Sequence, residues 1–594
     1  MKKIYSLLLA LCVSAHTYSQ TFISMMDVNM LDMRFRSNGL FAPTPFGHPS
    51  LEVGGAPPRG LLYSGGLWLG GLDSGGQLHF SAHMYGSDGH DFISGPLTTD
   101  GSASIDPAVV QQYDRIWRIH GSQVEQHRHY YACLADPECD INTEFPGGYT
   151  IPNDFLNWPA MGDVSAGQSL YLAPFYDHDS DGNYDPTSGD HPCVQGDLAM
   201  YMIYNDKGQP HLESGGDPFG VEVHMMPFAY ISADQELNNT IFIHYRLINR
   251  SNGTYNNFHM GIFSDFDIGC SNDDIVGTDV PRNMVYGYNG DDLDEDCLGS
   301  TGFQAQPPAL GMLVLKGPLM DPTGADDPQD GSQPSFNGSG FGDGMIDNER
   351  HGLSGSMHFR RQGNNAQTEP AALPHFYNYL RSIWKDNVPL TYGGNGYSQD
   401  PGAVPSDFAF PGDSDPTGVG TGGGATGAWH DMLDPLMPDP KMIATMGPIT
   451  LEPGEEQEIL IAYVYAHSDG GGAYGSVEAL QLYADSVLAF AQTIPGLMAG
   501  GSVCDGLSVG IDASGEVGTI GLFPNPASHL INIHLGEHAG PCTIEVTDMR
   551  GTRVLQRTTS GSSIVLDIAH LAPGPYIIRT SDARSIRIGR FVKE

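Results

Sequence analysis

Residues 240–249 read TIFIHYRLIN, and this stretch decides the fold class. Ile241, Ile243, Tyr245 and Leu247 recur at every second position, so a strand would place all four side chains on one face. Similar apolar runs bounded by turn residues lie at 199–204, 221–231 and 459–465. Short strands separated by Gly-rich turns are typical of β-sandwiches. We therefore expect a mainly β protein with several β-sandwich-like domains and long loops rich in Gly, Pro and Asp.

Composition supports the same class. The 594 residues include 77 Gly and 42 Pro, and 70 acidic residues against 27 basic ones give a net charge of −43. So much Gly excludes a helical bundle or coiled coil as the main architecture, while 40% hydrophobic residues are enough to form a core. The acidic excess repels phosphate backbones, so we expect no nucleic-acid partner. It attracts divalent cations.

The first nineteen residues have the layout of a secretory signal peptide. Lys2 and Lys3 precede an apolar stretch at 4–13, and small or polar residues follow at 14–19. No later run of eighteen apolar residues occurs, so we expect a soluble protein once it is exported. In an oxidising compartment Cys133 and Cys139, which bracket a short loop, are plausible disulfide partners.

Changes in composition divide the rest of the chain. We expect a β-rich domain at 20–150, a second β-rich domain with an Asp/Gly loop at 151–320, and a loop-rich region at 321–495 that ends in strands and one helix. A Gly/Ser-rich linker at 496–516 precedes an independent unit at 517–594.

The one convincing helix is predicted to begin with Ser476 as its N-cap and to end before Pro495. Its predicted apolar face consists of Val477, Leu480, Ala484, Val487 and Ala491. The face indicates packing against a core, and nothing on it indicates chemistry.

The loop that begins at Asp177 reads DHDSDGNYD and has the spacing of a calcium loop. Carboxylates stand at positions 1, 3, 5 and 9, Gly182 at position 6 allows a sharp bend, and position 7 offers a carbonyl. An EF-hand has Glu at position 12, where this chain has Ser188, so Asp190 or a distant residue must close the site. We predict a structural Ca²⁺ site; the alternative is a metal-free Asp/Gly turn. The predicted ligands are Asp177, Asp179, Asp181, Asn183, Asp185 and Asp190.

Three other acidic segments, 265–279, 291–296 and 343–349, are weaker candidates for cation binding. A solvated acidic surface is the more favoured interpretation for the first two of them.

The C-terminal segment carries the most specific pattern. Its elements are an FPNP opening at 523–526, a DMRG turn at 548–551, an LAPGPY segment at 571–576 and a basic last strand. Alternating strands and tight turns indicate a small antiparallel, immunoglobulin-like β-sandwich. Basic residues concentrated here imply a partner. An ordinary adhesive β-domain is the alternative interpretation.

In the order of these motifs, residues 518–594 resemble the type A C-terminal sorting domain of the type IX secretion system of Bacteroidota. The resemblance implies export from the periplasm, after Sec delivery, to the outer cell surface or the medium. It also implies the secretion machinery and a sortase as partners, with attachment to surface lipopolysaccharide or release. The sorting-signal residues it implies are Pro524, Asn525, Pro526, Gly551, Gly574, Tyr576, Arg590 and Lys593.

The cargo region, residues 30–495, resembles a large secreted family of the same phylum. The stretches that carry this resemblance are 65–71, 91–97, 177–192, 264–269, 377–385 and 448–454. It indicates export and a Ca²⁺-like loop and gives no chemistry.

We therefore expect a secreted or surface-attached, calcium-stabilised β-protein with a structural, adhesive or ligand-binding role. Extracellular glycan is a candidate ligand. The sequence contains no H-E-x-x-H, no G-x-S-x-G and no P-loop. The alternative is a secreted hydrolase of polysaccharide or protein that uses paired carboxylates, since such chemistry needs only two carboxyl groups about 5 to 9 Å apart.

Overall fold

The structure is a computed structural model. It describes residues 22–41, 49–54, 57–86, 89–297, 299–329, 337–432, 438–499, 503–504, 518–519, 521–523, 527–534, 542–548, 553–559, 561, 563–571, 574–581 and 586–593. Contacts divide the chain into a large unit, Met1–Leu507, and a small unit, Ser508–Glu594. The predicted signal peptide and most of the predicted linker lie outside the described residues.

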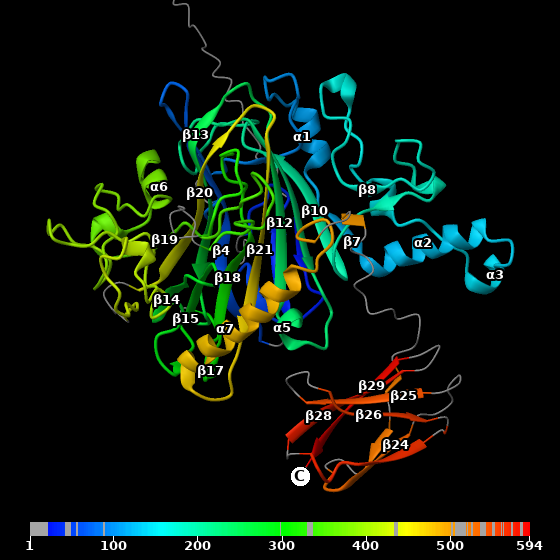
Figure 1. The fold of residues 1–594 in the computed structure, drawn as a ribbon. Coiled ribbons are helices and arrows are strands. Elements are labelled where there is room, and N and C mark those ends of the chain that lie inside the picture. Colours follow the sequence, from blue (N-terminus) through cyan, green and yellow to red (C-terminus); the bar gives the residue numbers. More distant parts are fainter. Residues whose placement is uncertain are drawn as a thin grey trace, which may run out of the picture. The chain divides into compact units, whose positions relative to one another are not determined.

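The large unit contains an eight-stranded antiparallel sheet in the order β1-β2-β3-β4-β13-β20-β19, with β5 paired to β4 (Figure 1). Its strands are β1 (Ile23–Met26), β2 (Leu31–Arg36), β3 (Leu51–Val53), β4 (Arg59–Asp73), β5 (Leu78–Ala82), β13 (Tyr255–Phe266), β19 (Gly355–Arg360) and β20 (Pro440–Leu451).

A nine-stranded antiparallel sheet forms the second layer, in the order β14-β15-β18-β21-β12-β11-β10-β6, with β7 paired to β10. Its strands are β6 (Ile93–Ser94), β7 (Trp117–His120), β10 (Leu198–Asn205), β11 (Val221–Ala229), β12 (Thr240–Asn249), β14 (Asp274–Asp279), β15 (Met284–Asn289), β18 (Ala309–Lys316) and β21 (Glu456–Ala466).

Short elements fill the connections of the large unit. Two small antiparallel pairs join β8 (Phe175–Tyr176) to β9 (His191–Pro192) and β16 (Leu293–Asp294) to β17 (Gln304–Ala305). The helices are α1 (Pro107–Tyr113), α2 (Gly121–Ala135), α3 (Ile141–Glu144), α4 (Asn153–Leu156), α5 (Gln235–Asn238), α6 (Leu373–Tyr379) and α7 (Gly472–Ala491). The 3-10 turns are η1 (Val164–Ala166), η2 (Pro186–Ser188), η3 (Asn365–Gln367) and η4 (Val419–Thr421).

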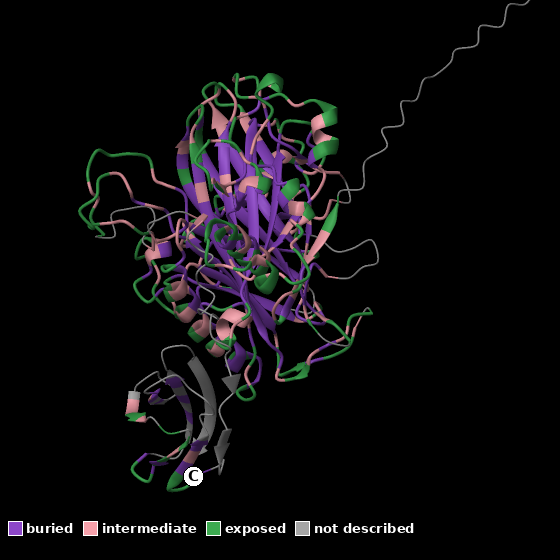
Figure 2. Cartoon of the chain, turned by 90° about the vertical axis from the view of Figure 1, so that its right-hand side faces the viewer, coloured by how far each residue is buried: buried purple, intermediate pink, exposed green. Residues whose placement is uncertain are grey.

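The main core lies between the two large sheets, which makes the large unit a β-sandwich. Ile241, Ile243, Tyr245 and Leu247, the face predicted from β12, are all buried in this core. The Ser264 hydroxyl of the first sheet lies 2.8 Å from a hydroxyl of the second, on β21. Figure 2 shows the buried residues concentrated in the strands and the exposed ones in the peripheral loops. The predicted mainly β fold class is confirmed.

Helix α7 covers the outer face of the nine-stranded sheet, over β18 and β21 (Figure 1). All five residues of its predicted apolar face are buried. The start of the helix differs from the prediction, because the N-cap is Gly471 and Ser476 lies one turn inside. The buried Ser476 hydroxyl accepts the backbone N–H of Ser468 at 3.1 Å instead of capping the helix.

Helix α2 was not predicted, and Figure 1 shows it at the periphery of the large unit. Only Val124, His127 and Cys133 are buried on it, so it has no continuous apolar stripe to reveal it in the sequence. His120 and Gln123 form a capping box at its start.

The loop-rich region 321–495 packs against the core. Trp384, Phe408, Phe410 and Trp429 are buried in the main core, although few regular elements lie around them. Segments 20–150, 151–320 and 321–495 all supply strands to the two large sheets. The sheets thus join segments that composition alone separates.

Three disulfides fasten the large unit: Cys133–Cys139, Cys193–Cys504 and Cys270–Cys297. The first was predicted and is confirmed. The second spans 311 residues and ties the chain beyond α7 to the segment before β10. Since the partners lie far apart in sequence, spacing gives no clue to this pairing.

The small unit contains a five-stranded sheet, β22-β29-β28-β25-β26, and a three-stranded sheet, β23-β24-β27. Its strands are β22 (Gly518–Thr519), β23 (Gly521–Phe523), β24 (Leu530–His534), β25 (Cys542–Asp548), β26 (Arg553–Thr559), β27 (Ser563–Asp567), β28 (Gly574–Ser581) and β29 (Ile586–Lys593). Ile531, Ile544, Leu566 and Ile578 from both sheets share one core, as a small sandwich requires.

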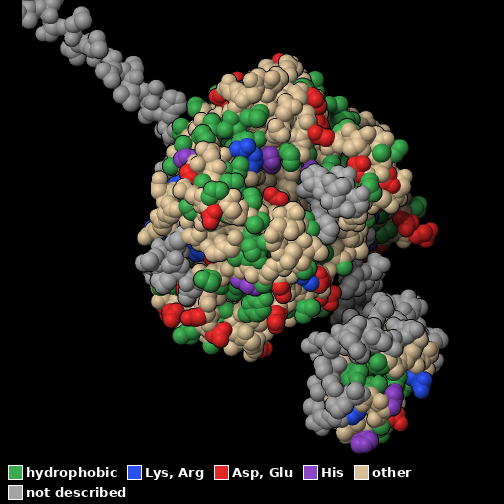
Figure 3. All heavy atoms as spheres, turned by 60° about the vertical axis from the view of Figure 1, so that its left-hand side comes forward, with side chains coloured by type: hydrophobic (Ala, Val, Ile, Leu, Met, Phe, Trp, Pro, Cys, Tyr) green, Lys and Arg blue, Asp and Glu red, His purple; other side chains and the backbone are tan. Residues whose placement is uncertain are grey.

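Acidic side chains predominate over basic ones on the face of the large unit shown in Figure 3, and they are spread over it. This distribution follows from the 70 acidic and 27 basic residues of the chain. Among the described helices, none has both the length and the hydropathy that a membrane crossing requires.

Candidate functional site

The predicted calcium loop connects β8 to β9. In this short antiparallel pair Phe175 lies opposite Pro192, and Tyr176 lies opposite His191. Asp177 and Asp190 are the next residues on the two strands, so the ladder itself brings the ends of the loop together. This is why two residues thirteen positions apart lie side by side.

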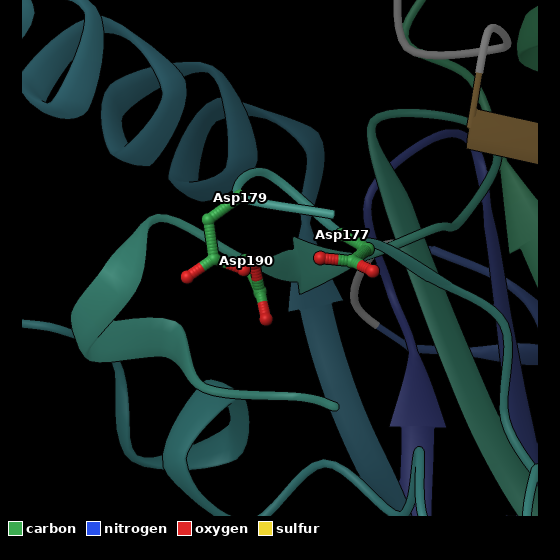
Figure 4. Close-up of side chains that lie close together, drawn as sticks. All are labelled: Asp177, Asp179 and Asp190. Carbon is green, nitrogen blue, oxygen red and sulfur yellow. The ribbon is translucent and has the colours of Figure 1, made fainter. Parts of the chain in front are cut away.

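Three carboxylates meet at this point. One oxygen each from Asp177, Asp179 and Asp190 lies within 4.8 Å of the other two. Figure 4 shows the three side chains directed toward a common space inside the loop. Asp190 is buried, Asp177 is half-buried and Asp179 is exposed, so the cluster opens to solvent on one side.

Backbone N–H groups fix the two inner carboxylates. Asp190 accepts the N–H of His178 at 2.8 Å and that of Asp185 at 2.7 Å. Asp177 accepts the N–H of Gly182 at 2.8 Å. Gly182 has φ = 80°, which a residue with a side chain rarely adopts, so the predicted need for Gly at the bend holds.

The electrostatics of the cluster are unfavourable without a cation. Burial raises the pKa of Asp190, and the charges of Asp177 and Asp179 raise it further. Hydrogen bonds to the carboxylate oppose this rise only in part. The charges that shift the pKa of Asp190 most are therefore those of the two neighbouring carboxylates.

The other predicted ligands lie elsewhere in the loop. The Asp181 carboxylate accepts the N–H of Asn183 at 2.7 Å, and the Asp185 carboxylate accepts the N–H of Thr187 at 2.8 Å as the cap of η2. Hydrogen bonds from Thr187 lower the pKa of Asp185. The structure therefore brings Asp177, Asp179 and Asp190 together, and it uses Asp181, Asn183 and Asp185 in turns.

A second acidic cluster has its own counter-ion. Asp265 and Asp267 at the end of β13 meet Asp439, which precedes β20. Lys441 Nζ lies 3.3 Å from the Asp265 carboxylate and also bonds to Asp439. Burial raises the pKa of Asp265, while for Lys441 the neighbouring carboxylates outweigh burial and raise its pKa. A buried ammonium thus forms ion pairs with two of the three carboxylates.

A pocket of about 390 Å³ adjoins the calcium loop on the outer face of the nine-stranded sheet. Its polar lining comes from Tyr201 on β10, His224 on β11, His244 and Arg246 on β12, and Glu458 on β21. His224 lies opposite Arg246 in the strand register, and Arg246 lies opposite Glu458. The three side chains therefore form one row across three strands.

Beside this row, two residues before His224 on β11, Glu222 anchors a buried network. Tyr201 Oη lies 2.8 Å from His224 Nδ1, and His224 Nε2 lies 2.9 Å from the Glu222 carboxylate. Arg250 donates to the same carboxylate at 2.7 Å. Burial opposes the charge of Glu222, but hydrogen bonds from His224 and Arg250 outweigh it and lower the pKa to about 2. Because Glu222 stays ionised, its carboxylate accepts a hydrogen bond from His224 Nε2. His224 Nδ1 then accepts a hydrogen bond from the Tyr201 hydroxyl.

None of the residues that line this pocket was predicted as a site residue. The available signal was the polar residues inside otherwise apolar strands: His244 and Arg246 in β12, and Glu222 and His224 in β11. In β12 they occupy the positions between the core residues, so the alternation that identified the core face also marked the opposite face.

Of the predicted sorting-signal residues, those with described backbone lie in β28 and β29. Gly574 pairs with Lys593, Tyr576 with Phe591, and Arg590 with Ile577. Tyr576 and Lys593 are buried. Pro524, Asn525, Pro526 and Gly551 lie outside the described residues.

Comparisons with known proteins give a family match at the C-terminal end of the chain and likenesses to solved structures. No curated protein matches the chain. A solved polysaccharide lyase shares 8% identity at a TM-score of 0.17, and the aligned region covers 63% of this chain and 34% of the lyase. The chain thus spans about a third of the lyase, and at this TM-score the likeness carries no argument. The model of the secretion system C-terminal sorting domain matches residues 521–594, so this chain carries a sorting domain that supports export through the type IX secretion system to the cell surface or beyond.

Proposed function

We propose that the large unit is a calcium-stabilised β-protein that acts outside the cell in a structural, adhesive or ligand-binding role. The predicted signal peptide at 1–19 would deliver the chain to the periplasm. The sorting domain at 521–594 would then engage the type IX secretion machinery and a sortase. Surface lipopolysaccharide is the proposed attachment point, and extracellular glycan is the proposed ligand.

The observation that carries the calcium proposal is the convergence of Asp177, Asp179 and Asp190. Ca²⁺ binds oxygen ligands at about 2.3–2.6 Å, so two oxygens on one ion lie no more than about 5 Å apart. The three carboxylate oxygens meet this requirement. Two carboxylates at contact range repel each other by about 1 kcal/mol even in water, and burial increases the repulsion. A bound cation would remove it.

The contrast with the Asp265 cluster supports this assignment. Both clusters bring three carboxylates together, but the Asp265 cluster contains Lys441. At Asp190 the charges with the largest effect are those of two further carboxylates, Asp177 and Asp179. The cluster at the calcium loop is therefore the one that requires an external cation.

Thermal unfolding with Ca²⁺ and with EDTA tests the proposal. A ligand bound only to the native state stabilises it by about 2.7 kcal/mol at a hundred times its dissociation constant. We expect a higher Tm in Ca²⁺ than in EDTA. An identical Tm in both conditions contradicts a structural calcium site.

The hydrolase alternative receives no comparable support. Paired-carboxylate hydrolysis needs two carboxyl groups about 5 to 9 Å apart at the substrate. The pocket beside the calcium loop is lined by one carboxylate, that of Glu458. A binding role suits this lining better than paired-carboxylate hydrolysis.

A further inference from the structure

The pocket beside the calcium loop has the size of a small-molecule site. Its volume of about 390 Å³ lies within the range of roughly 300–1,000 Å³ that ligand pockets occupy. Its floor is the outer face of β10, β11, β12 and β21. Segment 171–175 forms one wall, and Val503 with Cys504 forms another. The Cys193–Cys504 disulfide fastens that second wall to the sheet side.

His244 supplies an unused polar group to this pocket. The residue is 8% exposed, and its Nε2 has no hydrogen-bond partner among the described residues. The nearest carboxylate oxygen, on Glu458, lies 3.8 Å away, beyond hydrogen-bond distance. A buried polar atom without a partner is unfavourable, so a ligand atom that bonded to it would be stabilised.

The two charged side chains of the lining, Arg246 and Glu458, each have an oppositely charged partner. Arg246 donates two hydrogen bonds to Glu456, at 2.9 and 2.5 Å. Glu458 accepts a 2.7 Å hydrogen bond from Lys316. Burial lowers the pKa of His244 to about 4, so its ring is neutral at neutral pH and offers one donor and one acceptor. The lining therefore presents polar groups without an excess of charge, which favours an uncharged polar ligand.

Aromatic and apolar side chains complete the lining. Tyr171 and Phe175 lie on the wall with ring centroids 6.2 Å apart. Tyr171 is 51% exposed, although its hydroxyl donates to the Gly182 carbonyl at 3.2 Å. An exposed ring face beside planar Arg and Glu groups complements a pyranose, whose C–H face packs on the ring while its hydroxyls both donate and accept.

We propose that this pocket binds a neutral sugar residue, with His244 bonding to a ring hydroxyl and Tyr171 packing against the sugar face. The inference rests on the ligand-binding role proposed above and names its site and ligand class. Arg246 and Glu458 would contact further hydroxyls while Arg246 keeps its ion pair with Glu456 and Glu458 keeps its ion pair with Lys316. The neutral lining excludes a preference for acidic sugars.

Saturation-transfer NMR on the exported full-length protein tests this inference. The probes are D-glucose, D-galactose, D-mannose and N-acetyl-D-glucosamine, with D-glucuronate as the acidic comparison. We expect saturation transfer to at least one neutral sugar and weaker transfer to D-glucuronate. His244→Ala and Tyr171→Ala should each weaken the affinity at least tenfold.

Matched controls separate the pocket from general damage. His129→Ala replaces an exposed His on α2, and Tyr474→Ala replaces a Tyr that is 43% exposed on α7; both should bind as the parent does. Absence of transfer to all four neutral sugars, stronger binding of D-glucuronate, or unchanged affinity in folded His244→Ala and Tyr171→Ala would each overturn the inference. The Ca²⁺-dependent shift in Tm is measured separately. If this shift is present but no sugar binds, the pocket inference is refuted and the calcium proposal stands.

Discussion

The backbone N–H of Asp185 donates a 2.7 Å hydrogen bond to the buried Asp190 carboxylate. Both residues were predicted as calcium ligands, yet they have different roles. Asp190 joins Asp177 and Asp179, while Asp185 holds the loop closed around it and caps η2.

Asp179→Asn should abolish most of the calcium effect on stability. Asp179 is exposed, so the substitution removes one carboxylate without disturbing the core. If affinity falls a hundredfold, a stabilisation of about 2.7 kcal/mol shrinks to about 0.4 kcal/mol at the same Ca²⁺ concentration. Differential scanning fluorimetry with Ca²⁺ and with EDTA measures the change. Asp181→Asn, in the same loop but outside the cluster, is the control; equal responses of the two variants would refute the assignment.

Removing the Cys193–Cys504 disulfide should cost more stability than removing Cys133–Cys139. The first closes 311 residues and the second closes 6. Loop-closure entropy gives about 6 and about 2 kcal/mol, respectively. Urea unfolding of the two Cys→Ser double variants measures the difference. The entropic account fails if the variant that lacks the Cys133–Cys139 disulfide is the less stable of the two.

Asp431→Asn should be strongly destabilising. Arg360 Nη2 lies 2.6 Å from both Asp431 carboxylate oxygens, and each side chain is 4% exposed. Breaking a buried pair leaves an uncompensated charge and costs about 3–5 kcal/mol. Asp485→Asn, which breaks an ion pair between Arg282 and a carboxylate that is 53% exposed, should cost less than about 1 kcal/mol. The denaturant midpoints of the two variants measure their losses of stability. Comparable losses in Asp431→Asn and Asp485→Asn would contradict the burial argument.

His358 should make the protein sensitive to acid. Burial, together with the neighbouring charge of Arg360, lowers its pKa from an ordinary value of 6.5 to about 3. The folded state therefore binds fewer protons than the unfolded state between about pH 6.5 and 3, and this contribution to stability is lost as the pH falls through that window. Relative to the His358→Gln variant, the parent protein should lose up to about 1.4 kcal/mol of unfolding free energy for each pH unit within this window. Urea unfolding near pH 7 and pH 5 tests this; a constant difference between the two proteins would count against it.

Deleting residues 518–594 should leave the protein in the periplasm. The deletion removes the matched sorting domain, whose sheets and core are separate from the large unit. Cell fractionation and protease accessibility on intact cells measure the location, with the full-length chain as control. Surface display of the truncated protein would refute the role of this segment.

Sequence predicted the elements well where one periodicity was strong. The alternation in Thr240–Asn249 matched β12 residue for residue, and the apolar face of α7 was correct. Helix α2 was missed because its buried residues are too few to form a stripe. Ser476 was mistaken for a cap because its hydroxyl finds Ser468 only in the folded chain.

The sequence by itself determined the fold class, the acidic character, the sorting segment and the Asp/Gly loop, because each is written in local periodicity, composition or spacing. Only the tertiary structure decided which carboxylates converge, because pairing of β8 with β9 places Asp190 beside Asp177 and leaves Asp185 outside. It also decided that Asp439 and Lys441 join Asp265, and that His224, Arg246 and Glu458 form one row. Strand register sets these neighbours, and register depends on contacts between segments that can lie more than two hundred residues apart, as β12 and β21 do, which no local pattern records.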